Sequence, residues 1–86
     1  MTSPTDIPVH AQLFRLMLCE NEGQDLMSIL RSVMELTQLS LAEAMHKTWE
    51  ARYMGRSQLM ISHQERAEHY ASEFDNRGLT VVVEPA

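Results

Sequence analysis

Residues 14–23 read Phe-Arg-Leu-Met-Leu-Cys-Glu-Asn-Glu-Gly and combine a strand pattern with an acidic turn. Apolar side chains recur at every second position from Phe14, which is the period of a half-buried β-strand, and we expect this strand over Leu13–Cys19. The acidic stretch from Glu20 to Gly23 follows at once, just before a helical pattern begins. Such an elbow exposes side chains and backbone N–H groups at the edge of a sheet. We therefore expect any ligand of this chain to bind at the elbow.

Two helices are predicted directly after the elbow. Asp25 is a suitable N-cap for a helix that runs to Thr37. Ser40-Leu-Ala-Glu43 is a capping box, in which serine and glutamate side chains each accept a backbone N–H, and the helix that it opens ends near Gly55. Helical spacing predicts two buried faces, which are Leu26, Ile29, Leu30, Val33 and Leu36 or Thr37 in the first helix and Leu41, Ala44, Met45, Thr48 and Trp49 in the second.

The rest of the chain predicts two more strands and a third helix. Leu59–Ile61 is a short second strand, and Ser62-His-Gln-Glu65 is a second capping box that opens the helix. Asn76-Arg-Gly78 closes this helix, because glycine readily takes the left-handed conformation of a helix end. Leu79–Val83 is rich in β-branched residues and forms the last strand. The buried face of the third helix is expected to consist of Ala67, Tyr70, Ala71 and Phe74.

The predicted element order is β-α-α-β-α-β. The predicted fold class is α/β (α+β), with an open three-stranded antiparallel sheet and three helices packed on one side. A chain of 86 residues with 44% hydrophobic content has room for one domain and one core. We expect this domain over residues 11–86, and a disordered tail over residues 1–10, where two prolines and polar residues show no periodicity. Core filling is the favoured role of four methionines, which are Met17, Met34, Met45 and Met60.

Composition and charge exclude several classes of function. A net charge of −5 argues against nucleic-acid binding, which needs a basic face to neutralise phosphates. No apolar run approaches the roughly 20 residues that cross a bilayer, and the N-terminus has no charged and apolar segments of a secretory signal. Cys19 is the single cysteine, which excludes an internal disulfide and fits a reducing compartment. We therefore expect a cytoplasmic protein that binds neither nucleic acid nor membrane.

The sequence does not predict an enzyme, a metal site or a cofactor. Of the four histidines, only His63 and His69 share an element, and their spacing places them on different faces of a helix. With three glycines in the chain, we find neither a G-x-S-x-G elbow nor a glycine-rich phosphate loop. Glu20 and Glu22 could form an acid–base pair, since side chains two apart on an extended segment share a face. A solvated acidic turn is the favoured interpretation of these two glutamates.

Four stretches together resemble the ClpS family, the small adaptors of the Clp AAA+ proteases. They are Phe14–Glu22, Trp49–Arg56, Ser62–Tyr70 and Gly78–Pro85, and the resemblance covers about residues 11–86. The family opens with an apolar strand running into Asn-Asp-Asp. Its second helix ends in His-Tyr-x-Gly or a variant, and its last strand ends near Glu-x-Ala. The resemblance implies the same β-α-α-β-α-β fold.

The resemblance also implies a function without catalysis. ClpS proteins recognise the free N-terminus of a substrate that begins with Leu, Phe, Tyr or Trp, and deliver that substrate to the ATPase. The Asn-Asp-Asp elbow and the histidine hold the α-amine, while the first side chain enters an apolar pocket. Carried over by position, the amine clamp falls on Glu20, Asn21, Glu22 and Arg52, and Arg52 takes the place of the histidine. The pocket gatekeeper falls on Leu26, and the other pocket-wall positions fall on Ile29, Thr48, Ala51 and Leu79.

The clamp positions depart from the family pattern. A neutral histidine can accept a hydrogen bond from an ammonium group, whereas arginine has donors and no acceptor. A positive charge about 4 Å from the amine costs on the order of 4 kcal/mol at an effective dielectric of about 20. We therefore expect weakened or altered recognition of the N-terminal signal, or N-degron. We also expect Arg52 to form an ion pair with Glu20 or Glu22.

The resemblance implies a docking surface for the N-terminal domain of a Clp AAA+ ATPase at the start of the third helix. The exposed residues expected there are Gln64, Glu65 and Glu68. The expected function is that of a ClpS-like adaptor that modulates or delivers protein substrates, whose partners are the ATPase and substrate N-termini. The alternative is a repurposed interaction module with the ClpS fold that binds neither N-degrons nor the ATPase.

Overall fold

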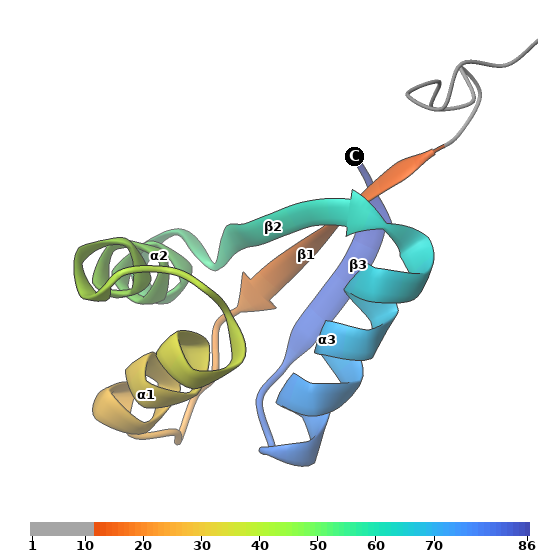
Figure 1. Ribbon diagram of the computed structural model, residues 1–86. Coiled ribbons are helices and arrows are strands. Elements are labelled where there is room, and N and C mark those ends of the chain that lie inside the picture. Colours follow the sequence, from red (N-terminus) through yellow and green to blue (C-terminus); the bar gives the residue numbers. More distant parts are fainter. Residues whose placement is uncertain (1–11) are drawn as a thin grey trace, which may run out of the picture.

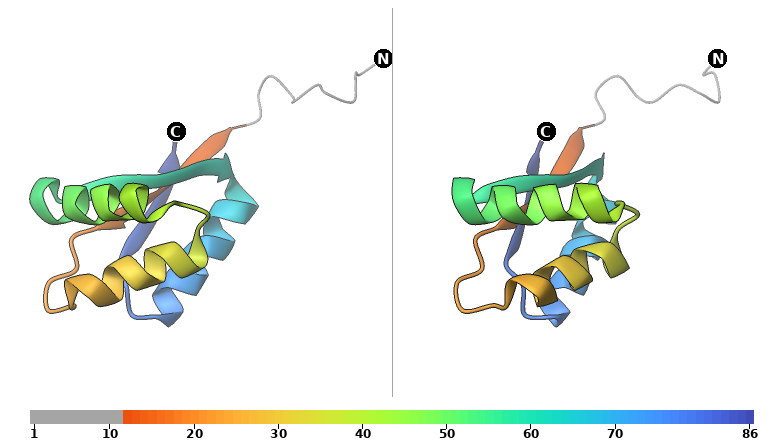
Figure 2. Two further views of the ribbon diagram at one scale, coloured as in Figure 1. Left: turned by 60° about the vertical axis from the view of Figure 1, so that its left-hand side comes forward. Right: turned by 90° about the vertical axis from the view of Figure 1, so that its left-hand side faces the viewer.

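The computed structural model describes residues 12–86, which form a three-stranded antiparallel sheet with three helices packed against it (Figure 1). The elements in chain order are β1 (Leu13–Cys19), α1 (Leu26–Leu36), α2 (Leu41–Met54), β2 (Arg56–His63), α3 (Gln64–Asn76) and β3 (Val81–Pro85). This is the predicted order and the predicted fold class. The helices lie on the same side of the sheet in both views of Figure 2. The predicted disordered tail over residues 1–10 lies outside the described residues.

β1 is the central strand of the sheet, and the strand order is β2-β1-β3. Its alternation works as predicted, because Leu16 and Leu18 are fully buried under the helices while Arg15 lies on the opposite face beside Glu84. In the pairing with β2, Leu16 lies opposite Met60 and Met17 opposite Gln58, so Leu59 is the extra residue of a β-bulge. Leu59 is itself buried in the core.

The two outer strands differ from their predicted bounds. β2 was expected over Leu59–Ile61 but begins at Arg56, because its polar first half pairs with the end of β1. β3 was expected from Leu79 but begins at Val81. Leu79 is instead part of the end of α3, where its N–H donates to the carbonyl oxygen of Phe74 at 3.1 Å. Long-range strand pairing and a helix-end motif therefore decide bounds that local propensity does not.

The predicted cap of α2 is present. The Glu43 N–H donates to Ser40 Oγ and the Ser40 N–H donates to Glu43 Oε1, so both bonds of the box are formed. Gly55 ends α2 with a φ of 90°, as the sequence predicts. The second predicted capping box, Ser62 to Glu65, is wrong: α3 is capped by His63 without a side-chain hydrogen bond. Ser62 belongs to β2 and pairs with Phe14, which places it outside the helix start.

The buried faces of α1 and α3 match the prediction, and that of α2 matches in part. Ile29, Leu30 and Val33 of α1 and Ala67 and Phe74 of α3 are buried, with Tyr70 and Ala71 packed beside them. α2 buries its small residues, which are Ala44, Thr48 and Ala51. The expectation that its large residues face the core is wrong, because three of them are exposed, namely Leu41, Met45 and Trp49. Of the four methionines expected in the core, Met34 and Met45 are exposed.

Small side chains explain the orientation of α2. A helix with alanine and threonine at its contact face brings its axis closer to the sheet than bulkier residues would allow. The Thr48 hydroxyl donates to the Ala44 carbonyl oxygen at 2.7 Å, so no buried polar atom is left unpaired on this face. α2 therefore packs against the core through its small residues, and its large apolar residues are exposed to solvent.

Candidate functional site

The elbow is the segment from Glu20 to Asp25 between β1 and α1, and backbone hydrogen bonds fix it on two sides. The Glu20 N–H donates to the Gly55 carbonyl oxygen at 3.0 Å, which ties the elbow to the end of α2. The Cys19 N–H donates to the Thr80 carbonyl oxygen at 3.1 Å, which ties the end of β1 to the segment before β3. The elbow therefore lies next to the last turn of α2, which carries Arg52.

The Asn21 side chain holds the elbow in place by hydrogen bonds to the backbone. Its Nδ2 donates to the Cys19 carbonyl oxygen at 2.6 Å, and its Oδ1 accepts the Thr80 N–H at 2.6 Å. The side chain lies between the elbow and the segment before β3, and the residue is 8% exposed. Both ends of the amide are thus engaged by the backbone, so the residue at this clamp position serves the fold.

The charged members of the predicted clamp remain in solvent. Glu20, Glu22 and Arg52 are all exposed. The expected ion pair of Arg52 with Glu20 or Glu22 is wrong, because the ion pairs within residues 12–86 are Arg15–Glu84, Arg56–Glu84 and Arg77–Glu35. Exposed pairs gain little in water and lose side-chain entropy, so proximity in the fold does not by itself produce one. The three charges remain available to a ligand.

The predicted pocket wall lies mostly inside the core. Leu26 at the start of α1 is partly exposed. The other four positions are at most 4% exposed, and they are Ile29, Thr48, Ala51 and Leu79. Three of these side chains, those of Ile29, Ala51 and Leu79, belong to one hydrophobic cluster with Leu16 and Phe74. Three of the five wall positions thus pack in one core cluster in this structure, and their role as the wall of a pocket stays a prediction.

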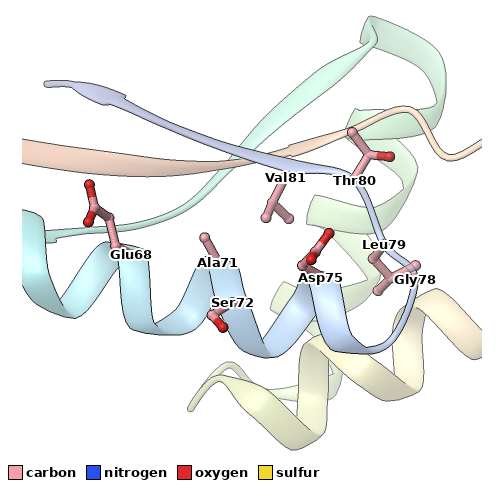
Figure 3. A pocket seen from close by; sticks show the side chains of 8 residues that line it. All are labelled: Glu68, Ala71, Ser72, Asp75, Gly78, Leu79, Thr80 and Val81. Carbon is pink, nitrogen blue, oxygen red and sulfur yellow. The ribbon is translucent and has the colours of Figure 1, made fainter.

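Three open cavities lie elsewhere on the surface. The first, about 600 Å³, lies between α3 and the start of β3, with Glu68 and Asp75 at its rim and Ala71, Leu79 and Val81 on its inner side (Figure 3). The second, about 540 Å³, lies beside the outer edge of β2 near Tyr70, and the third, about 330 Å³, lies between α1 and α2. None of these three cavities is lined by Glu20, Glu22 or Arg52.

The expected docking residues are exposed on the first two turns of α3. The Gln64 Nε2 donates to Glu68 Oε2 at 3.0 Å, and Glu65 lies free of the capping role predicted for it. Glu68 also lines the first cavity. The start of α3 therefore presents a polar, acidic surface. It lies at the end of the sheet opposite the elbow, because β2 runs antiparallel to β1.

The uncovered face of the sheet carries a charged network that the sequence analysis missed. Glu84 of β3 accepts hydrogen bonds from Arg56 of β2 and from Arg15 of β1, so the network spans all three strands. The hydrogen bond from Arg56 holds the pKa of the Glu84 carboxyl below its ordinary value. The sequence feature that could have predicted this network is the alternation of β1, which places Arg15 on the face opposite Leu16.

The described residues contain neither a cluster of metal-binding side chains nor a membrane-spanning helix. Residues 12–86 contain no group of three or more histidine, cysteine or acidic side chains placed to hold a metal ion. No helix in the described part of the chain has the length and apolar character needed to span a membrane.

The fold is similar to one of known structure. No protein-family model matches the sequence, and no curated protein matches it. Among solved structures, that of Agrobacterium tumefaciens ClpS2 bound to L-phenylalaninamide matches with a TM-score of 0.84 and 17% sequence identity. The match covers 88% of this chain and 99% of that one. The resemblance seen in the motifs is thereby confirmed at the level of architecture, and the chain has the ClpS fold.

Proposed function

We propose that this chain is a non-enzymatic ClpS-like adaptor of the cytoplasm. It binds the N-terminal domain of a Clp AAA+ ATPase and modulates or delivers protein substrates for degradation. The observation that carries the proposal is the match along almost the whole of a ClpS protein bound to L-phenylalaninamide. That compound has the free α-amine and aromatic side chain of an N-terminal phenylalanine.

Recognition of such N-termini is weakened or altered in this proposal. At the clamp, Arg52 offers donors where an acceptor is needed. The Asn21 amide is already engaged by Cys19 and Thr80. Glu20 and Glu22 still supply exposed carboxylates that can attract an ammonium group. The pocket wall must also open before a side chain can enter, because Ile29 and its neighbours are packed together. Arg52, the engaged Asn21 amide and the packed wall lower the affinity, whereas the two glutamates preserve an attraction for the amine.

The same features favour one second candidate, a repurposed interaction module with the ClpS fold. Such a module binds neither N-degrons nor the ATPase. In such a module no amine has to bind beside the arginine, and no side chain has to enter the packed pocket wall. The two candidates differ in whether the acidic start of α3 binds a Clp N-terminal domain.

The test is a titration of an isolated Clp ATPase N-terminal domain against this protein by calorimetry. The wild type is expected to bind, and Glu68→Lys is expected to bind about tenfold more weakly, because it reverses a charge at the proposed contact. Glu68 accepts only an exposed hydrogen bond from Gln64, so the substitution spares the fold. Asp75→Lys is the matched control, since it makes the same charge change at the far end of the same helix.

Equal binding by wild type and Glu68→Lys would show that the start of α3 is not the docking surface. Absence of binding by both, with the protein folded, would favour the repurposed module.

A further inference from the structure

Six large apolar side chains lie exposed on the outward side of the two helices that follow the elbow. Their exposed fractions run from 38% for Met34 and Trp49 to 76% for Tyr53. α1 and α2 lie side by side and face the viewer in the right-hand view of Figure 2. We call this surface the α1–α2 apolar face, and it consists of Met27, Met34, Leu41, Met45, Trp49 and Tyr53.

The face has an ordered, grooved shape. Its four members on α2 follow one another at intervals of four residues, from Leu41 to Tyr53, and therefore form a single ridge. The rings of Trp49 and Tyr53 are stacked, with centroids 5.4 Å apart and planes 11° apart. A cavity of about 330 Å³ separates the ridge from α1, with Met27, Met34 and Leu41 among its lining residues.

The exposed area is large for a chain of this size. Aromatic side chains bury about 150–250 Å² each, and the same scale applied to the methionines and the leucine gives an upper bound on the order of 600 Å² left in water. This is the upper end of the apolar patches of monomeric proteins, which reach about 300–600 Å². With an equal area from a partner the interface would be about 1,200 Å², the lower limit of specific complexes.

Unpaired positive charge accompanies the face, although the chain as a whole is acidic. Arg31 lines the groove, and Arg52 lies within about 40° of Leu41 and Met45 around α2. Within the described part of the chain neither arginine forms an ion pair. Glu35, the carboxylate that lines the groove, is bound by Arg77. The charge that the face leaves for a partner is therefore positive.

We propose that the α1–α2 apolar face binds an acidic amphipathic helix of a partner protein. Helices leave no unpaired backbone edge on which an extended peptide could add as a strand, whereas a ridge and groove between two helices suit the apolar stripe of a third. Carboxylates beside that stripe would meet Arg31 and Arg52. This proposal does not rest on the adaptor function, although Arg52 is shared with the clamp positions.

A second copy of the chain suits the face less well. In a two-fold pair the same patch meets itself, so the unpaired arginines of both copies would gather in one interface. The area is also well below the roughly 2,000 Å² or more of obligate dimers.

The single tryptophan of the chain, Trp49, lies in the face and reports on it directly. The probe is a tryptophan-free peptide of about 20 residues, long enough to be helical, with leucines at helical spacing on one side and glutamates beside them. Titration is expected to shift the Trp49 emission to shorter wavelength and to saturate. A peptide of the same composition with its leucines distributed around the helix should bind about tenfold more weakly or worse.

Two variants and a control locate the binding. Met45→Glu should lower affinity about tenfold or more, while Ile61→Glu on the open side of the sheet should leave it unchanged. Arg31→Glu should weaken binding of the glutamate peptide and strengthen binding of its lysine counterpart. All three positions are exposed, so the substitutions spare the core.

Four results would overturn the proposal. They are the lack of a saturable shift in emission, equal binding of the two leucine arrangements, equal binding by Met45→Glu, and a dimer seen by sedimentation in the absence of peptide. A shift produced by phosphatidylglycerol vesicles but not by the peptide would assign the face to a membrane surface and would also overturn it.

Discussion

Arg52 occupies the clamp position at which we propose that recognition of a free N-terminus is weakened. The guanidinium lies exposed at the end of α2, one turn from the backbone hydrogen bond that joins Gly55 to the elbow. An incoming ammonium group would meet a like charge there and find no acceptor on that side chain. The acidic side chains Glu20 and Glu22 attract the ammonium group. The net affinity therefore depends on whether their attraction exceeds the repulsion by Arg52.

We expect peptides that begin with Phe or Leu to bind weakly to the wild type, and Arg52→His to raise their affinity about tenfold. The substitution removes the positive charge of the guanidinium and supplies the acceptor nitrogen of a neutral imidazole. Fluorescence anisotropy with a labelled peptide measures the gain, and an N-acetylated peptide should show none. Arg52→Gln separates the two effects, because it removes the charge without supplying the imidazole.

Tight binding by the wild type, or a histidine variant that binds no better than the glutamine variant, would contradict this account of the clamp.

The sequence could predict that the elbow lies next to the end of α2, but not how the side chains there are engaged, and that they form a binding site stays a prediction. The elbow, Arg52 and the wall positions were all placed near one another, because local motifs and a family resemblance locate them. The engagement of Asn21 by Thr80 joins residues 59 positions apart, and no local pattern encodes such a bond. The burial of Leu79 likewise depends on packing between elements that meet only in the folded chain, whereas helical spacing already predicted the burial of Ile29.

At the scale of elements, two identical sequence signals lead to different structures. Ser40-x-x-Glu43 and Ser62-x-x-Glu65 both match a capping box, and only the first forms one. The difference comes from strand pairing, which holds Ser62 opposite Phe14. α2 shows a similar competition, since it carries a small apolar face and a large one, and periodicity alone cannot say which faces the core.

Ser40→Ala should therefore destabilise the fold by about 1 kcal/mol. For a domain of this size that corresponds to a fall in melting temperature of about 4–8 °C. The serine is exposed and its loss removes the acceptor of the Glu43 N–H, so the effect is that of the cap. Ser62→Ala is the matched control and should change stability by less than about 0.5 kcal/mol. Equal losses in thermal unfolding of both variants would show that the second box forms after all.

At the scale of the whole molecule, the two faces of the sheet are stabilised differently. One face is covered by helices and buries Leu16 and Leu18, while the other is open and is crossed by the Arg15–Glu84–Arg56 network. The network places charge over a surface where Ile61 and Val82 are exposed. Burying charged side chains is costly, so we expect the network to limit association with other chains through this face.

Glu84→Gln should lower stability at about pH 7 and lower it less at about pH 3. The folded-state pKa of Glu84 is lowered by Arg56, so its contribution to stability is complete above the ordinary carboxyl pKa and is lost as the pH falls through the lowered value. Urea unfolding of both proteins at the two pH values measures the difference. Glu65→Gln, an exposed glutamate outside any ion pair of the described residues, is the control.

A destabilisation of Glu84→Gln that persists unchanged in acid would mean that packing of the side chain, rather than its charge, is responsible.

The Asn21 amide joins two segments of the molecule that are far apart in the sequence. Its hydrogen bonds join the elbow to Thr80, and Thr80 directly follows Leu79 of the pocket wall. Leu79 cannot swing away from the core without pulling on Thr80, and a displacement of Thr80 breaks a bond that holds the elbow in place. We therefore expect a displacement of Leu79 to disturb the elbow as well. Under the proposed function, a ligand that enters the wall would also displace the elbow, and local unfolding of either segment would expose both.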